Sequence, residues 1–186
     1  MKLGAHESVA GGVSLAFGRA AEHGARSVQI FTRSGRSWSS PPLEEEERRA
    51  FRRQARGAGV PAIAHGSYLV NLASEDRAIR GRSLAAVREE LLRCEALGIR
   101  SLVFHPGSHI STRRGLRLVA RALDEVHRAL PDSPVRVCLE VTAGQGNCLG
   151  HRLEDLEEIL LRLHAPERVG VCLDTCHLFG DRKSHV

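Results

Sequence analysis

The sequence predicts an α/β protein of the (β/α)₈ TIM-barrel class, with about six of the eight βα units present. Short apolar segments alternate along the chain with longer amphipathic segments, which is typical of parallel strands connected by helices. Candidate metal-binding side chains follow four successive predicted strands. Side chains from neighbouring strands meet most readily at the carboxyl-terminal face of a barrel, so this second pattern favours that architecture.

The predicted strands are short apolar segments, and the last of them stops abruptly at Asp174. Because the segment before Asp174 is continuously apolar and rich in Val, we expect it to be a fully buried strand. The six predicted strands are Lys2–Ala5, Ser27–Phe31, Val60–Ala64, Ser101–Phe104, Val135–Leu139 and Val169–Leu173.

The predicted helices carry apolar residues at i, i+3 and i+4, with Arg and Glu on the opposite face. They are Ser14–His23, Leu43–Arg56, Ser83–Leu97, Gly115–Leu130 and Leu153–Leu163. This alternation is compatible with a doubly wound open sheet as well as with a barrel. An open sheet gathers its site at one switch point, whereas the candidate ligands here follow four strands, so the barrel is favoured.

We expect residues 1–179 to form a partial barrel domain and residues 180–186 to form an atypical polar tail. A complete barrel needs about eight units and about 250 residues. Two units are therefore expected to be missing, which leaves exposed strand edges. Either the sequence is a fragment of a longer protein, or another chain completes the barrel.

Composition and charge place the chain among soluble globular proteins, with 42% apolar and 26% charged residues. No apolar run is long enough to span a membrane, and no signal peptide is predicted. The five cysteines form no CxxC pair, so we expect free thiols, a reducing compartment and a cytoplasmic location without a membrane partner. The net charge of +5 is compatible with a polyanionic partner but is too common to identify one.

A mixed set of imidazoles and carboxylates is the main candidate for chemistry. It consists of His65, His105, Glu140, Asp174 and His177. Zinc, manganese and iron accept such donors, whereas calcium and magnesium prefer oxygen alone. A carboxylate among histidines can bridge two metals, an arrangement suited to displacement at phosphorus. Alternatively, Asp174 caps a following helix, and any single histidine is a hydrogen-bonded core residue. Four strand ends in succession favour the metal site.

Other residues have less specific patterns. His23, His127, His151 and His164 fall on or near predicted helices and are expected to be solvated. Trp38 and Tyr68 are in predicted loops, with Arg36 and Leu69 nearby. An exposed aromatic and aliphatic pair can enter a DNA duplex and unstack a base step, although ordinary loop packing is the alternative.

Six motifs extend over the chain up to about Phe179. They are Gly4-Ala5-His6-x-Ser8-x-x-Gly11-Gly12, Phe31-Thr32, His65-x-Ser67-Tyr68-Leu69-x-Asn71-Leu72, Phe104-His105-Pro106-Gly107-Ser108-His109, Thr142-Ala143-Gly144-Gln145-Gly146 and Val169-Gly170-Val171-Cys172-x-Asp174-Thr175-Cys176-His177. In this order they resemble the endonuclease IV family of apurinic/apyrimidinic (AP) endonucleases, which are deoxyribonucleases of base-excision repair.

The resemblance implies a barrel of the endonuclease IV and xylose isomerase-like type that is a monomer in its complete form. It implies three zinc ions and hydrolysis of the phosphodiester 5′ to abasic sites in double-stranded DNA, leaving a 3′-hydroxyl. By position, His65, His105, Glu140, Asp174 and His177 match zinc ligands, with Glu140 as the bridging, catalytic carboxylate. Arg36, Tyr68 and Leu69 match residues that enter DNA and stabilise the flipped-out abasic nucleotide.

Two departures from the family pattern bear on activity. The later zinc ligands of the family (a further His, an Asp-x-His pair and a late Glu) belong to the missing units, and Gly180–Val186 replaces the usual sequence. We therefore expect this chain alone to hold fewer than three metals and to be weakly active or inactive. The alternatives are a metal-dependent sugar isomerase or epimerase on a related barrel, and an inactive remnant that at most binds metal or DNA.

Overall fold

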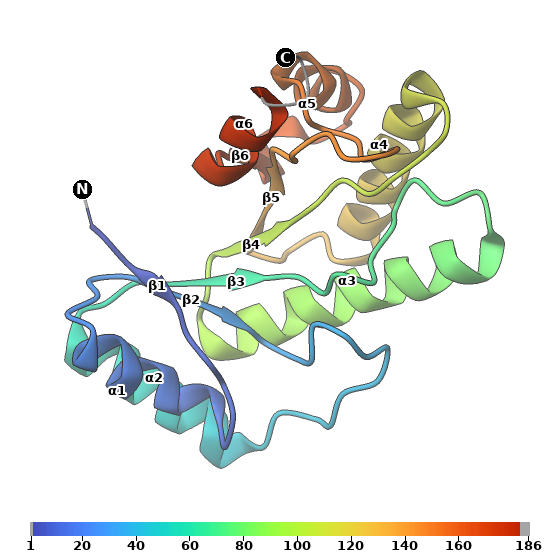
Figure 1. Ribbon diagram of the computed structural model, residues 1–186. Helices are drawn as coiled ribbons and strands as arrows, with labels where there is room; N and C mark the ends of the chain where they lie inside the picture. Colours follow the sequence, from blue (N-terminus) through green and yellow to red (C-terminus); the bar gives the residue numbers. More distant parts are fainter. Residues whose placement is uncertain (1, 183–186) are drawn as a thin grey trace.

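The computed structural model describes residues 2–182 and contains one sheet of six parallel strands. The strands lie side by side in the order in which they occur along the chain (Figure 1). They are β1 Ala5–His6, β2 Val28–Phe31, β3 Ala62–His65, β4 Ser101–Phe104, β5 Arg136–Glu140 and β6 Val169–Cys172. A doubly wound sheet reverses its order at a switch point, so the sequential order supports the barrel alternative.

Helices connect the successive strands and lie outside the curved sheet (Figure 1). They are α1 Ala16–Glu22, α2 Glu45–Ala58, α3 Arg77–Leu97, α4 Thr112–Ala129, α5 Leu153–Leu160 and α6 Thr175–Arg182, with 3₁₀ turns η1 Val13–Leu15 and η2 Pro166–Arg168. No helix within residues 2–182 has the length and apolarity needed to cross a membrane. All five cysteines are free thiols, but only Cys94 is buried and Cys176 is exposed.

Helix α3 begins at Arg77, six residues before the predicted start at Ser83. The carboxylate of Asp76 accepts hydrogen bonds from the backbone N–H groups of Ala78 and Ile79 and so caps the helix. The first turns of α3 are polar and lack the apolar spacing on which the prediction depended. At the other end of the chain, α6 extends through Gly180 to Arg182, and the remainder of the predicted tail, 183–186, lies outside the described residues.

The core lies between the helices and the outer face of the sheet. Alternate strand side chains point toward the helices and are almost completely buried: Val28, Ile30, Leu102, Phe104, Val137 and Leu139. The intervening side chains, including His65 and Glu140, point to the other face. The period of two along each strand therefore separates the packed core from the face that carries the predicted ligands.

Two burial predictions were wrong. Strand β6 is not fully buried, since Val171 is 41% and Leu173 60% exposed. Within the described residues β6 pairs only with β5, and Val171 borders an open pocket beside α5 instead of packing closely against that helix. His127 is buried rather than solvated. It lies four residues after Leu123, on the apolar stripe of α4, so helical position rather than residue type decided its burial.

The loop between β4 and α4 depends on Gly107, which has a φ of 115°. A Cβ at this position would lie 2.3 Å from Oδ1 of Asn71, whose side chain hydrogen-bonds the backbone of Ser108. Gly107→Ala is therefore expected to destabilise the fold by at least about 1–3 kcal/mol in denaturant unfolding. The control is Gly81→Ala in α3, where no atom lies within 4 Å and an alanine should stabilise by about 0.5–1 kcal/mol. Equal unfolding midpoints for the two variants would contradict this account of the loop.

Candidate metal centre

The predicted ligands lie where parallel strands end at one edge of the sheet. His65 and Glu140 are the last residues of β3 and β5, and His105 directly follows β4. Asp174 lies between β6 and α6, and His177 is in the first turn of α6. Because the strands are neighbours in sequential order, their carboxyl ends bring these side chains together.

One group consists of His65, His105 and Glu140, whose nitrogen and oxygen atoms all lie within 4.8 Å of one another. Oε2 of Glu140 is 3.0 Å from Nε2 of His65 and 3.2 Å from Nε2 of His105. Glu140 and His65 are buried, and His105 is half-buried. Two imidazoles thus converge on one carboxylate oxygen.

The second group shares Glu140 with the first and adds Asp174 and His177. Oε1 of Glu140 and Oδ2 of Asp174 each lie 3.6 Å from Nδ1 of His177. The other oxygen of Asp174 accepts hydrogen bonds from the N–H groups of Cys176 and His177. Both interpretations of Asp174 therefore apply, because one oxygen caps α6 and the other faces the group.

Backbone carbonyls orient two of the imidazoles. Nδ1 of His65 lies 2.8 Å from the carbonyl oxygen of Gly66, and Nδ1 of His177 lies 2.9 Å from that of Val141. At His65, a neutral imidazole that donates Nδ1–H to the carbonyl leaves free the Nε2 lone pair, which faces Glu140. Histidines that bind metals are commonly oriented in this way. The donor set, nitrogen with carboxylate oxygen, fits a dication such as zinc better than magnesium or calcium.

The charge state of the shared carboxylate follows from its neighbours. Burial alone would raise the pKa of Glu140, but hydrogen bonds from His105 and His65 outweigh burial and hold that pKa well below its usual range. Burial also acts to lower the pKa of His65, yet the hydrogen bond to Glu140 prevails and raises it. Glu140 is therefore an anion throughout the physiological pH range, as a cation ligand must be.

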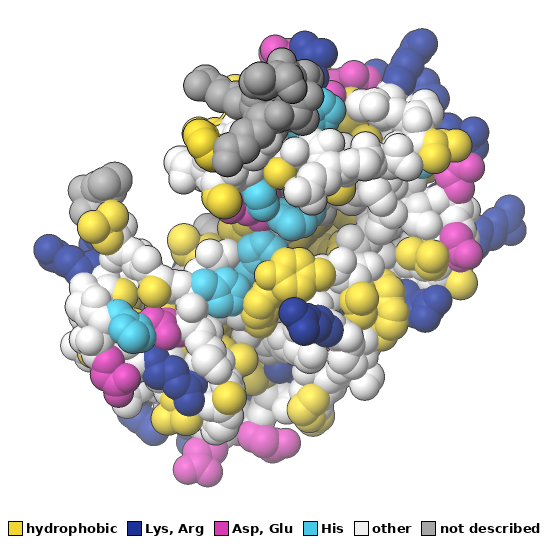
Figure 2. All heavy atoms as spheres, viewed as in Figure 1, with side chains coloured by type: hydrophobic (Ala, Val, Ile, Leu, Met, Phe, Trp, Pro, Cys, Tyr) yellow, Lys and Arg dark blue, Asp and Glu magenta, His cyan; other side chains and the backbone are white. Residues whose placement is uncertain are grey.

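The loops after β2 and β3 lie beside these groups. Tyr68 is 58% exposed, and its ring centroid lies 5.7 Å from that of His65 and 6.4 Å from that of His105. A cavity of about 180 Å³ is bordered by these three residues and by the half-buried Leu69. Arg36 is exposed on the preceding loop. Figure 2 shows histidine side chains gathered in the middle of this face, next to hydrophobic ones.

Trp38 differs from Tyr68, because it packs against the core and lies under the guanidinium of Arg82, 5.2 Å from its ring centroid. Ordinary packing therefore accounts for Trp38, whereas Tyr68 is exposed and lies beside the candidate ligands.

A family model described as xylose isomerase-like TIM barrel matches residues 17–184. The chain belongs to this family. The predicted TIM-barrel fold is thereby confirmed, with six parallel strands in the described part. Solved structures of this type include a D-tagatose 3-epimerase-like protein, which superimposes with a TM-score of 0.77 at 20% sequence identity. The match covers 96% of this chain and 66% of that protein's chain. At so low an identity the likeness shows the fold alone.

Within this xylose isomerase-like family, the resemblance to endonuclease IV is also confirmed. A protein named probable endonuclease 4 from Chloroflexus aurantiacus is 41% identical over 96% of this chain and 64% of its own length. Another of that name from Geobacter sulfurreducens is 42% identical over 96% of this chain and 61% of its own. Endonuclease IV from Thermus thermophilus superimposes with a TM-score of 0.84 at 34% identity, covering 97% of this chain and 65% of that one. The chain thus spans less than two thirds of these endonuclease IV relatives.

Helix α3 holds the two loops beside the candidate metal centre of this barrel. Glu90 accepts a hydrogen bond from the N–H of Ser67, and Arg93 donates to the carbonyl oxygens of Thr32 and Pro41. Arg33 is paired with Glu89 at 2.7 Å and donates to the carbonyl oxygens of Ser37 and Trp38.

The loops are also joined directly, because the N–H of Tyr68 and the hydroxyl of Ser67 both donate to the carbonyl oxygen of Gly35.

Glu90 and His6 also belong to this region and were not predicted from the sequence. His6 ends β1, and its ring centroid lies 6.3 Å from that of His65. His6 directly follows the predicted strand Lys2–Ala5, as His65 follows Val60–Ala64, so the same strand-end rule applied to the first strand would have found it. Glu90 lies on an apolar helix stripe, and its packing partner, Ser67, is remote in sequence, so no local pattern marks it.

Burial of Glu90 raises its pKa to about 7 despite the hydrogen bond from Ser67. Between about pH 4.5 and 7 the carboxyl group of Glu90 stays protonated in the folded chain but ionises in the unfolded chain. The free energy of unfolding is therefore greatest below about pH 4.5 and falls by roughly 3 kcal/mol as the pH rises to about 7. Glu90→Gln should abolish this part of the pH dependence, which thermal unfolding between pH 4.5 and 8 would measure. Glu90→Ala should be less stable than Glu90→Gln at pH 5 because it leaves the Ser67 N–H unpaired. Parallel profiles for the original chain and Glu90→Gln would contradict the assignment.

Proposed function

We propose that this protein is a zinc-dependent endonuclease of base-excision repair that hydrolyses the phosphodiester 5′ to abasic sites in double-stranded DNA, leaving a 3′-hydroxyl. One observation supports the proposal more than any other. The two oxygens of Glu140 face separate groups of ligands, with the exposed Tyr68 beside the first group. That arrangement suits cleavage of a phosphodiester next to a DNA lesion. The relatives named probable endonuclease 4 support the endonuclease part of this proposal.

In this proposal His65, His105 and Glu140 hold one zinc ion, and Glu140, Asp174 and His177 hold a second. Zinc would act as a Lewis acid on the phosphate and lower the pKa of a bound water. The chain supplies orientation and charge: the carbonyl oxygens of Gly66 and Val141 fix two imidazoles, and Glu140 remains an anion between the two groups. Fewer than three metals are proposed for this chain alone.

Recognition of the lesion is assigned to Arg36, Tyr68 and Leu69. An abasic nucleotide lacks stacking, so a duplex opens more easily there, and an aromatic and an aliphatic side chain can occupy the space of the missing base. Tyr68 is exposed and close to the ligand groups, and the guanidinium of Arg36 can neutralise a nearby phosphate. The rigid connection of the two loops through Gly35 supports this role, because both would approach the duplex together.

The proposal is tested with zinc-loaded protein in excess over a labelled duplex that contains one abasic analogue. Since weak activity is expected of this chain, single-turnover conditions are used. The expected result is a slow nick on the 5′ side of the lesion that is absent from an undamaged duplex and from Glu140→Gln. Turnover of a ketose without any incision would instead support the sugar epimerase alternative. Equal cutting of damaged and undamaged duplexes would contradict lesion recognition by Tyr68 and Leu69.

A further inference from the structure

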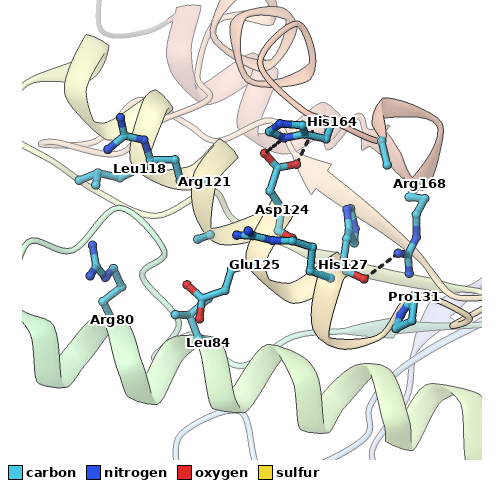
Figure 3. A pocket seen from close by; sticks show the side chains of 13 residues that line it. Arg80, Leu84, Leu118, Arg121, Asp124, Glu125, His127, Pro131, His164 and Arg168 are labelled. Atoms are coloured by element: carbon cyan, nitrogen blue, oxygen red, sulfur yellow. Dashed lines mark hydrogen bonds and ion pairs between the residues drawn. The ribbon is translucent and has the colours of Figure 1, made fainter.

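Two cavities of the described chain differ in what their hydrogen bonds connect. The larger, of about 670 Å³, lies between α3, α4 and the connection from α5 to β6 (Figure 3). Asp124 accepts a hydrogen bond from the backbone N–H of His164 there, and Arg168 donates to the backbone carbonyl oxygen of His127. These contacts join a helix to a connection that carries no candidate ligand. In the cavity of about 180 Å³ beside the candidate metal centre, a side chain joins two loops that carry candidate functional residues.

The side chain that joins these two loops is the amide of Asn71, six residues after the end of β3. Its Nδ2 donates to the carbonyl oxygen of Ser108 at 3.1 Å, and its Oδ1 accepts from the N–H of Ser108 at 3.1 Å. Oδ1 also accepts from the N–H of Ala73 at 3.0 Å, which fixes the amide relative to its own loop. The amide therefore binds both backbone groups of one residue in the loop after β4, which requires a donor and an acceptor on the same side chain.

His105 is the candidate ligand whose orientation depends most on the loop after β4. Nδ1 of His65 and Nδ1 of His177 each face a backbone carbonyl oxygen. Nδ1 of His105, by contrast, has no hydrogen-bond partner among residues 2–182. Only two residues separate His105 from Ser108. The direction of the His105 ring is therefore set by the backbone of its loop, without help from a carbonyl oxygen at Nδ1.

The loop after β4 is held from two sides. On one side the contact with Asn71 is close, since a Cβ at Gly107 would lie 2.3 Å from Oδ1 of Asn71. On the other side, the N–H of Leu149 donates to the carbonyl oxygen of Gly107, and the N–H of His109 donates to that of Asn147. Of these contacts, only that of Asn71 is made by a side chain. It is therefore the contact that a substitution removes directly.

We propose that Asn71 is a positioning residue that holds the imidazole of His105 in place for the metal. Its amide fixes the backbone at Ser108, and the intervening Pro106-Gly107 segment is short and contains a proline, whose ring fixes φ. Residues that orient a metal ligand without touching the metal commonly change its affinity by about 10–100-fold. This inference rests on the proposed metal centre, in which His105 is a ligand.

The test is a double-mutant cycle on zinc affinity, measured by chelator competition with Asn71→Ala, His105→Ala and the double variant. Asn71→Ala alone should weaken zinc binding about 10–100-fold. Because Asn71 acts through His105, the same substitution should cost no more than about twofold further affinity in the His105→Ala chain. Asn147→Ala is the matched control. Its side chain is exposed on the neighbouring loop and makes no hydrogen bond with residues 2–182, so zinc affinity should be unchanged.

A second measurement needs no metal. Long-range ¹H–¹⁵N NMR spectra of the metal-free chain at constant pH report the ring nitrogens of each histidine. Asn71→Ala should shift or broaden the ring signals of His105 and leave those of His177 in place, because the carbonyl oxygen of Val141 still orients that ring.

Three results would overturn the proposal. They are unchanged ring signals of His105, losses of zinc affinity that add in the double variant, and a lowered melting temperature of Asn71→Ala with zinc affinity intact. The last of these would show that Asn71 only stabilises the fold. If the original chain binds no zinc, the proposed metal centre fails, and the NMR spectra of the metal-free chain still decide whether Asn71 holds the His105 ring.

Discussion

Replacing Glu140 by alanine is expected to remove both candidate cation sites with one substitution. Its two oxygens face different groups, so no other described residue serves both. Removing a residue that only hydrogen-bonds a metal ligand lowers metal affinity by about 10–100-fold. Removing a ligand that two metals share should lower metal affinity further. Zinc affinity and incision of an abasic duplex are both expected to fall by more than a hundredfold. A chelator competition titration and a single-turnover incision assay measure the two effects.

Two controls separate this effect from unfolding. Glu140→Gln preserves the size of the side chain and should lose zinc to nearly the same extent, because the negative charge is removed. Glu154→Ala removes an exposed carboxylate in the first turn of α5 and should leave zinc affinity unchanged. Circular dichroism of each variant reports whether the fold persists. Undiminished zinc binding by folded Glu140→Ala would contradict the shared-carboxylate model.

Zinc affinity is expected to fall steeply with decreasing pH. Burial acts to lower the pKa of His65, but the hydrogen bond to Glu140 outweighs it, so the pKa is raised and the proton persists above the usual range. A metal must displace that proton, and each proton released changes affinity by about tenfold per pH unit below the pKa. Because the usual histidine pKa is about 6.5 and that of His65 is raised, lowering the pH from 8 to 5 should weaken zinc binding by at least about thirtyfold.

The matched variant for this experiment is Glu140→Gln, which removes the partner that raises the pKa of His65. Its zinc affinity should be lower at pH 8 and should change less between pH 8 and pH 6. Competition titrations at constant ionic strength provide the comparison. A zinc affinity of the original chain that is the same at pH 8 and pH 5 would show that His65 does not lose a proton on binding.

The sequence predicted most of the fold because its strand and helix patterns are regular. Every predicted strand and helix has a counterpart in the described residues, and the strands lie in sequential order, as a barrel requires. The errors arose where tertiary context decides. The polar start of α3 is set by the Asp76 cap, Val171 of β6 is partly exposed because it borders an open pocket beside α5, and His127 is buried by its position on α4.

The candidate site was predictable for a related reason. Residues at the carboxyl ends of neighbouring parallel strands lie near one another. The order of the strands along the chain therefore predicts that His65, His105 and Glu140 form one group, as they do. The supports of the site could not be predicted in this way. Glu90 and Arg33 act across contacts between α3 and distant loops, and no spacing within the sequence identifies such pairs.

The carboxyl ends of β3 to β6 are proposed to hold a divalent metal around Glu140. Zinc-edge anomalous diffraction from crystals grown with zinc would locate the metal. The expected result is a peak within coordination distance, about 2.0–2.2 Å, of Nε2 of His65 and a carboxylate oxygen of Glu140. Zinc peaks found only at other residues, with these side chains unliganded, would contradict it.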